Sequence, residues 1–244
     1  MADERSLSFL SWNLALLERS AEAPPAWDQA AGEAAVRDRV LALAPDVVLL
    51  QELPGLVPYV ETHDMIRANP RSHSGHLATL VTHELMAAGP AHRVLPGCAI
   101  LTTFPGAGTG GGPALTVANV HLASGPGATA ERLAQLADVV EASPTEALLI
   151  VGDTNTRAAE MAAVEAAGLV TERPPRATWD SRRNRFRAGG AEFSAHFTRW
   201  FASPAVTVTE VAVWHQPLTV DGHRFHLSDH YALSGRVTLS GGDG

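Results

Sequence analysis

The sequence predicts a single mixed α/β domain in which strands outnumber helices. Short apolar runs alternate along the chain with alanine-rich stretches whose apolar residues recur at helical spacing. Some runs are apolar without alternation, as in Ala147–Val151, which is typical of a strand buried on both faces. Hydrophobic residues make up 45% of the 244 residues, enough to fill the core of one large domain. We expect this domain to span residues 1–240 and residues 241–244 to be a disordered tail.

The first half of the chain begins with a strand and a helix. Leu7–Trp12 alternates apolar and polar residues like a strand and ends at Asn13. Residues 28–44 carry valine and leucine at helical spacing, and Pro45 ends this segment because proline cannot continue a helix. The apolar runs that follow are expected to be strands at residues 46–50, 77–81, 98–103 and 114–120.

The second half repeats this alternation. Apolar residues at helical spacing predict helices at residues 131–141 and 157–167, the second stopped by Gly168. Between them, the strand at residues 147–151 meets Gly152, which we expect to let the backbone turn sharply where that strand ends. Two last strands, joined by a histidine-bearing loop, are expected at residues 206–213 and 231–239.

Composition and charge narrow the classes of function. The net charge of −8 argues against sequence-independent coating of duplex DNA, which needs many phosphate contacts. Six arginines between residues 173 and 187 form either a local basic groove or a solvated loop. A single cysteine excludes an internal disulfide, and no apolar run reaches the roughly 20 residues of a membrane helix. With no secretory signal pattern at the N-terminus, we expect a cytoplasmic monomer that does not bind a membrane.

Polar residues follow or border five of the apolar runs. Because polar groups at the strand ends of α/β sheets form ligand sites, we expect these side chains to gather at one place. Carboxylate and amide oxygens suit Mg²⁺ or Mn²⁺ better than zinc, histidines handle protons or stabilise charge, and the following Arg157 suits phosphate. The strand-end residues are Asn13, Glu52, His121, the pair Asp153 and Asn155, and the pair Asp229 and His230.

In this order and spacing, the motifs around these residues resemble the endonuclease/exonuclease/phosphatase superfamily over nearly the whole chain. The resemblance implies a four-layer α/β sandwich of two packed mixed β-sheets flanked by helices, the DNase I-like fold. It also implies phosphoester hydrolysis with a divalent metal, Mg²⁺ or alternatively Mn²⁺. The motifs are Ser11-Trp12-Asn13, Leu50-Gln51-Glu52, Asn119-Val120-His121-Leu122, Gly152-Asp153-Thr154-Asn155 and Ser228-Asp229-His230.

Within this superfamily, finer details of the sequence resemble the 5′-tyrosyl-DNA phosphodiesterase branch, that is, the tyrosyl-DNA phosphodiesterase 2-like proteins. His121–Ser124 followed by Arg132–Leu136 resembles the histidine strand and helix of that branch. Gly152–Arg157 matches its Gly-Asp-Thr-Asn-x-Arg motif. Thr178-Trp179-Asp180 with Asn184 resembles its Thr-Trp-Asp…Asn loop.

The resemblance implies a role for each site residue. Glu52 would be the main metal ligand, helped by Asn13 and Asp229. Asp153 would orient the attacking water, and Asn155 would bind a phosphate oxygen. The remaining residues would stabilise charge on the phosphoryl group or bind the substrate: His121 and His230 for the charge, and Arg157, Trp179 and Asn184 for the substrate.

One residue departs from the pattern of that branch. Its Arg-Phe-Asp-Arg-Ile-Phe strand corresponds here to His196–Phe201, so Thr198 replaces the aspartate that bonds the terminal histidine, here His230. A threonine hydroxyl can accept a hydrogen bond but brings no charge to favour the imidazolium. This replacement leaves three outcomes open. The enzyme is weakened but active, with another group such as His196 or Asp221 supporting His230. Alternatively, it is redirected to another substrate or reaction, or it binds its ligand without catalysis. Because the other site residues are present, we favour an active or repurposed enzyme.

Three kinds of function follow from these residues. The first is a Mg²⁺-dependent phosphodiesterase that acts on nucleic-acid 5′ ends or a similar phosphodiester, with single-stranded ends as partner. The second is a hydrolase of a small phosphorylated metabolite or lipid head group, which the acidic net charge favours over duplex binding. The third is a degenerate phosphate-binding module or a repurposed enzyme that acts on a non-nucleic-acid substrate.

Overall fold

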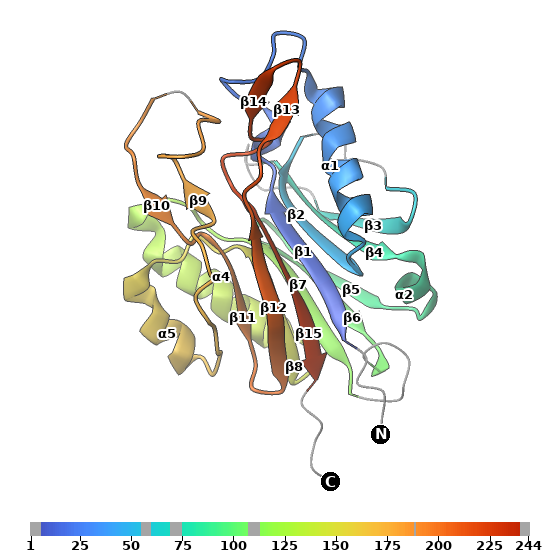
Figure 1. The fold of residues 1–244 in the computed structure, drawn as a ribbon. Coiled ribbons are helices and arrows are strands. Elements are labelled where there is room, and N and C mark those ends of the chain that lie inside the picture. The colour runs from blue at the N-terminus through green and yellow to red at the C-terminus, as the bar shows by residue number, and fades with distance from the viewer. Residues whose placement is uncertain (1–5, 55–59, 69–74, 107–112, 188, 240–244) are drawn as a thin grey trace.

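The protein folds into two β-sheets that pack face to face, with helices on both outer faces (Figure 1). The computed structural model describes residues 6–54, 60–68, 75–106, 113–187 and 189–239, so the expected tail at 241–244 lies outside the described residues. The helices are α1 (Gln29–Leu43), the short α2 (His83–Ala87), α4 (Thr129–Ala142) and α5 (Met161–Ala166). Single 3₁₀ turns precede or interrupt them: η1 (Ala15–Leu17), η2 (Pro126–Ala128) and η3 (Ala158–Glu160).

The first sheet has six strands in the order β12-β15-β1-β2-β4-β3. Only β1 and β2 run parallel, and the other neighbours pair antiparallel, so this sheet is mixed. Its strands are β1 (Leu7–Asn13), β2 (Val47–Leu53), β3 (His63–Ala68), β4 (His76–Thr82), β12 (Val206–Trp214) and β15 (Ala232–Leu239).

The second sheet has five strands in the order β11-β8-β7-β6-β5 and is also mixed, because only β7 and β8 run parallel. Two small hairpins lie outside the sheets, β9 (Trp179–Asp180) with β10 (Ser194–Ala195), and β13 (Leu218–Val220) with β14 (His223–Phe225). The strands of the second sheet are β5 (Ala91–Leu95), β6 (Ala99–Phe104), β7 (Leu115–His121), β8 (Ala147–Asp153) and β11 (Thr198–Ala202).

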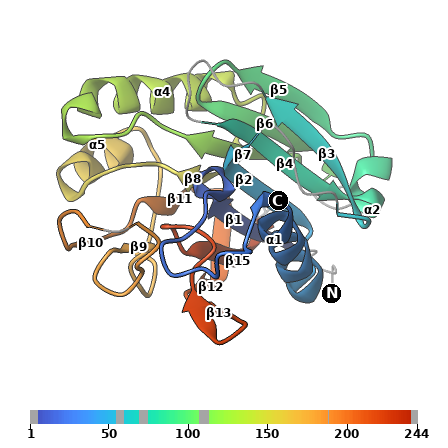
Figure 2. The ribbon, with the colours of Figure 1, turned by 90° about the horizontal axis from the view of Figure 1, so that it is seen from above.

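Alternate residues of the central strands fill different layers of the core. On β8, Leu149 and Val151 pack between the sheets, whereas Leu148 and Ile150 pack under α4 and α5. Both faces of such a strand are therefore buried, which is why its sequence is apolar without alternation. Figure 2 shows α1 and α4 on opposite sides of the two sheets, which gives the four layers expected from the resemblance.

The predicted strands and helices are confirmed, and the differences lie at the margins of the fold. The edge strands β3 and β5 were not predicted, because most of their side chains are exposed and show no apolar pattern. The β13–β14 hairpin occupies part of the segment expected to be a loop. No helix in the described part of the chain is long and apolar enough to cross a membrane.

The structure corrects the role expected of Gly152. This residue continues β8 rather than ending it, and it pairs with Val120 of β7. Its φ is +155°, and a Cβ atom there would lie 2.0 Å from the carbonyl oxygen of Val120. Glycine is required because β7 and β8 approach too closely for any side chain, so the strand reaches Asp153 without a turn.

Candidate active site

Four of the expected residues meet because two parallel strand pairs end at the same edge of the sandwich. In the first sheet Asn13 pairs with Gln51, which precedes Glu52. In the second sheet His121 pairs with Asp153. Parallel strands bring their carboxyl ends to one edge of a sheet, where ligands bind. The sandwich therefore places the ends of β1, β2, β7 and β8 side by side.

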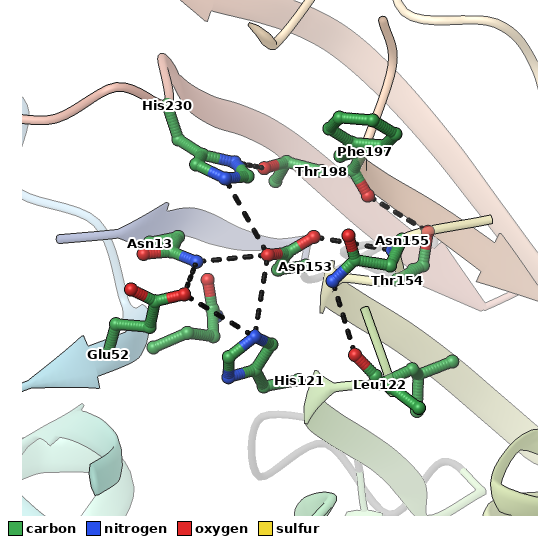
Figure 3. Close-up of polar contacts among 12 residues, drawn as sticks. Asn13, Glu52, His121, Leu122, Asp153, Thr154, Asn155, Phe197, Thr198 and His230 are labelled. Atoms are coloured by element: carbon green, nitrogen blue, oxygen red, sulfur yellow. Dashed lines mark hydrogen bonds and ion pairs between the residues drawn. The ribbon is translucent and has the colours of Figure 1, made fainter. Parts of the chain in front are cut away.

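Asp153 is the centre of this group (Figure 3). Its Oδ2 accepts a hydrogen bond of 2.9 Å from Asn13 Nδ2. The same oxygen lies 3.6 Å from His121 Nε2 and 3.7 Å from His230 Nε2. The residue is only 2% exposed. A buried carboxylate needs several donors or cations to replace water, and here two imidazoles and one amide supply them.

Glu52 extends the group toward solvent. Its Oε1 accepts from Asn13 Nδ2 at 3.0 Å and lies 3.6 Å from His121 Nε2. One ligand atom each from Glu52, His121 and Asp153 lies within 4.8 Å of the others. Two carboxylates and one imidazole fit a divalent cation, and the carboxylate oxygens suit Mg²⁺ or Mn²⁺. These three residues could hold a metal ion.

The other two expected metal ligands have their oxygens engaged elsewhere. Asn13 turns its amide nitrogen to the carboxylates, and its Oδ1 accepts from the backbone N–H of Ala15 at 2.9 Å. Asp229 Oδ2 accepts from Arg187 Nε at 2.6 Å. Asn13 thus joins Glu52 to Asp153, and the carboxylate of Asp229 is paired with a guanidinium.

Thr198 faces His230, as the sequence departure predicts. Its hydroxyl lies 3.3 Å from His230 Nδ1, and its side chain is fully buried. His196, one of the groups considered as an alternative support for His230, instead accepts a hydrogen bond from Arg173 Nε at 2.8 Å. The Nδ1 side of His230 therefore has a neutral partner where the branch has an anion.

Asn155 and Arg157 follow Asp153 in the chain, Asn155 contacts Asp153, and Arg157 contacts Asn155. The backbone N–H of Asn155 donates to Asp153 Oδ1 at 3.3 Å, and Asn155 Nδ2 donates to the carbonyl of Leu122 at 3.2 Å. Asn155 has φ of +51°, a left-handed conformation that Asn tolerates better than most residues. Arg157 donates to the carbonyl of Asn155 at 2.9 Å, and its guanidinium lies 5.2 Å from the Phe197 ring centre.

Trp179 and Asn184 differ in their relation to the site. Trp179 packs edge-on against His230, with 4.9 Å between the ring centroids. It is half-buried and also contacts the rings of Phe193 and Phe197. Asn184 is 4% exposed, and its amide donates to the carbonyl of Ser228 at 2.8 Å. Its Oδ1 accepts from the N–H of Phe186. Asn184 therefore holds the backbone before Asp229, while Trp179 walls the site.

Three supporting residues were not predicted from the sequence. Arg187 pairs with Asp229 and also lies 3.5 Å from Glu18, but in the sequence it is one of six arginines in a loop. Arg132 is fully buried and forms an ion pair with Glu160. The spacing of 28 residues between these two gives no signal in one sequence.

The arginine-rich segment does not act as one basic groove. Within it, Arg183, Arg185 and Arg187 each face a carboxylate, on Asp180, Glu192 and Asp229. Arg173 and Arg176 instead donate to histidine rings, those of His196 and His215. The segment is split between several local contacts, and of its arginines Arg187 pairs with a residue of the expected site, Asp229.

Comparison with known proteins identifies solved structures that share this fold. TDP2 from D. rerio, solved in complex with a single-stranded DNA product, has a TM-score of 0.70 and 21% identity, covering 96% of this chain and 99% of that chain. TDP2 from C. elegans has a TM-score of 0.68 and 18% identity, covering 96% and 75%. A family protein from Bacteroides thetaiotaomicron has a TM-score of 0.68 and 17% identity, covering 97% and 98%. At these identities the likeness shows a shared fold.

A comparison with curated protein sequences gave no match. The sequence profile described as "Endonuclease/Exonuclease/phosphatase family" matches residues 10–230. This match runs from β1 to the histidine before β15, so it includes every strand end that contributes to the site. The chain belongs to the endonuclease/exonuclease/phosphatase family.

Proposed function

We propose that this protein is a Mg²⁺-dependent phosphodiesterase that hydrolyses a phosphodiester by attack of water, with nucleic-acid 5′ ends as the leading substrate class. The observation that carries the proposal is the buried Asp153, which lies between His121 and His230 and accepts a hydrogen bond from Asn13. A carboxylate so placed can accept a proton from water while neighbouring imidazoles stabilise developing negative charge.

Each residue has a separate task in this reaction. Asp153 orients the attacking water and takes its proton, and Asn13 fixes the rotamer of Asp153 through the 2.9 Å hydrogen bond. His121 and His230 face the same oxygen of Asp153 and stabilise charge on the non-bridging phosphoryl oxygens. Asn155 donates one amide hydrogen to the carbonyl of Leu122 and would bind a phosphoryl oxygen with its second amide hydrogen.

The metal would be held mainly by Glu52, whose carboxylate lies in a compact group of ligand atoms with those of Asp153 and His121. When bound, Mg²⁺ supplies positive charge that polarises the phosphoryl group and stabilises the leaving oxygen. Asn13 donates to both carboxylates and so keeps them in position. Asp229 would have a structural task, because its ion pair with Arg187 anchors the backbone before His230.

The substrate class rests on two observations. The D. rerio TDP2 structure with a similar fold contains a single-stranded DNA product, and Trp179 walls the site beside His230, where it can stack on a base. The net charge of −8 favours the second candidate, hydrolysis of a small phosphorylated metabolite or lipid head group.

The proposal is tested by turnover of bis-p-nitrophenyl phosphate and of a 5′-tyrosyl oligonucleotide. We expect activity that requires Mg²⁺ and is lost in Glu52→Ala and Asp153→Ala. Glu210→Ala removes an exposed carboxylate on β12 and serves as the matched control with unchanged turnover. Turnover without a metal, or none on any phosphoester, would overturn the proposal. A preference for small phosphomonoesters over the oligonucleotide would select the second candidate.

A further inference from the structure

A cavity of about 510 Å³ opens beside the catalytic group, on the side of α5 and β11. It shares Arg157 and Phe197 with the site described above, and each is close in the chain to a residue of that site, Arg157 to Asn155 and Phe197 to Thr198. Phe197 precedes Thr198, which contacts His230, and the carbonyl of Phe197 accepts from the N–H of Thr154 at 2.9 Å. Its volume lies within the range of roughly 300–1,000 Å³ that is usual for small-molecule sites.

The wall of this cavity is cationic. Arg157, Arg173 and Arg199 all line it, and no ion pair joins any of the three to a carboxylate within the described part of the chain. The carboxylate on the wall belongs to Glu165 on α5. By contrast, Arg183, Arg185 and Arg187 of the neighbouring loop each form a salt bridge with a carboxylate. Three guanidinium groups without such a partner around one hollow are suited to an anion.

Neutral and aromatic groups keep these arginines in place without cancelling their charge. Arg199 Nε donates to the carbonyl of His196 at 2.6 Å, and Arg173 Nε donates to His196 Nε2 at 2.8 Å. Arg157 lies over the ring of Phe197. Burial, with Arg173 and Arg199 nearby, lowers the pKa of His196 to about 4, so this ring is neutral at pH 7 and can accept from Arg173. Burial, and then Arg173, also lowers the pKa of Arg199, so an anion between the two arginines would relieve their repulsion.

We infer that this cavity binds a second phosphate of the substrate, next to the phosphate that is cleaved at Asp153. The inference rests on the proposed function for the position of the cleaved phosphate. It predicts that preferred substrates carry at least two phosphates. A nucleic-acid strand has this chemistry, and so does a multiply phosphorylated metabolite or head group. Arg173 and Arg199 would determine this preference, because neither contacts the catalytic group.

The test is equilibrium binding of a fluorescein-labelled, 5′-phosphorylated tetrathymidylate, measured by fluorescence anisotropy without turnover in EDTA. Arg173 is exposed and on a loop, so Arg173→Glu is expected to fold, with an unchanged Tm. We expect Arg173→Glu to weaken binding about tenfold, since one exposed charge-assisted contact with phosphate is lost and repulsion replaces it. Arg182→Glu makes the same charge change at an exposed arginine outside the cavity, and we expect it to change binding less than twofold.

Competition separates the two sources of phosphate. Unlabelled tetrathymidylate and inositol 1,4-bisphosphate are each titrated against the labelled strand, and the better competitor identifies the source. Equal binding by Arg173→Glu and Arg182→Glu would overturn the inference. If the arginine dependence of binding is present but no phosphoester is hydrolysed, the second-phosphate cavity is retained and the proposed hydrolysis fails.

Discussion

Thr198 is the residue whose chemistry bears most on the reaction. Its hydroxyl lies 3.3 Å from Nδ1 of His230, whereas the other ring nitrogen, Nε2, faces Asp153. A hydroxyl can fix the ring by a hydrogen bond, but an anion would also favour the imidazolium form. Position 198 therefore supplies a hydrogen-bonding partner to His230 but no negative charge.

Replacing this hydroxyl by a carboxylate should raise the rate. In Thr198→Asp the carboxylate would pair with His230 and stabilise its charged form in the transition state. We expect kcat for a phosphodiester to rise about tenfold or more, measured with bis-p-nitrophenyl phosphate and Mg²⁺. Thr198→Val keeps the shape of the side chain and removes the hydroxyl, so it should lower kcat. An unchanged or lower rate in Thr198→Asp would show that the site is built around threonine.

At the scale of elements, the close approach of β7 and β8 sets the position of Asp153. The Cα partners Val120 and Gly152 leave no room for a side chain, since a Cβ on Gly152 would meet the backbone nitrogen, carbonyl carbon and carbonyl oxygen of Val120. The two strands can then end together, with His121 opposite Asp153. The glycine is therefore part of the geometry of the site, although it carries no chemistry.

A single methyl group at this contact should disrupt both stability and activity. We expect Gly152→Ala to lower the free energy of unfolding by about 3 kcal/mol or more, because backbone must move to admit the Cβ. Urea unfolding followed by circular dichroism measures this change. Gly168→Ala is the matched control, since Gly168 also has positive φ, at +78°, but open space around it. It should cost only about 1 kcal/mol, and an equal cost for both would contradict the argument.

A buried ion pair joins the segment that follows His121 to the segment that follows Asn155. Arg132 on α4 donates to Glu160 and to the carbonyls of Ala123 and Gly125, at 2.9 and 2.7 Å. Glu160 in turn accepts from the backbone N–H of Arg157 at 3.1 Å. The pair thus fixes the segment after β7 against the segment after β8, on the same side of the site.

Breaking this pair should destabilise the fold, because it leaves the fully buried Arg132 without its counter-charge. We expect Glu160→Gln to lower the free energy of unfolding by about 3 kcal/mol and to reduce turnover by displacing Asn155. Glu141→Gln, at an exposed position on the same helix as Arg132, is the control and should change stability by less than about 0.5 kcal/mol. Equal stability of the two variants would refute the role of the pair.

The same pair gives a dependence of stability on pH. Burial alone would raise the pKa of Glu160, but hydrogen bonds from Arg132, Thr129 and the backbone of Arg157 outweigh it and lower the pKa below 4.5. Because the folded-state pKa is lowered, the contribution of Glu160 is present above about pH 4.5 and is lost as pH falls through the folded value. The difference in unfolding free energy between the wild type and Glu160→Gln should therefore shrink from pH 6 to pH 3.

At the scale of the whole molecule, a net charge of −8 opposes a polyanionic substrate. The arginines that line the cavity beside the site are the local exception to this charge. Attraction of a nucleic-acid strand is therefore confined to a small area rather than spread over a face. The protein should bind strand ends with few ionic contacts.

This confinement predicts a weak dependence of oligonucleotide binding on salt. For three arginine–phosphate contacts on a single strand, the slope of log K against log salt should be about −2, at about 0.7 per contact. The slope is measured with the labelled tetrathymidylate between 50 and 300 mM NaCl, and Arg173→Glu should make it shallower. A slope steeper than about −5 would instead indicate a broad basic surface.

The sequence by itself determined the central strands, the two main helices and the polar residues at the strand ends, because apolar periodicity and strand-end chemistry are local signals. The edge strands β3 and β5 lack that periodicity and were not predicted. It also marked Thr198 as a departure, since the motif around it fixed its place in the chain. Gln51 illustrates the limit of such signals. It belongs to a recognisable motif, but only the packed sheets show its Nε2 donating to Asn119 of the other sheet at 2.8 Å.

The tertiary structure alone decided which polar groups share a partner. It turned the nitrogen of Asn13 to two carboxylates and paired Asp229 with Arg187. It also placed three arginines around one cavity with no ion pair to a carboxylate among the described residues. The sequence separation of these contacts is long, and many pairings of an arginine with a carboxylate are equally compatible with local pattern. Only the packing of the two sheets against each other selects among those pairings, because burial makes each unpaired charge costly.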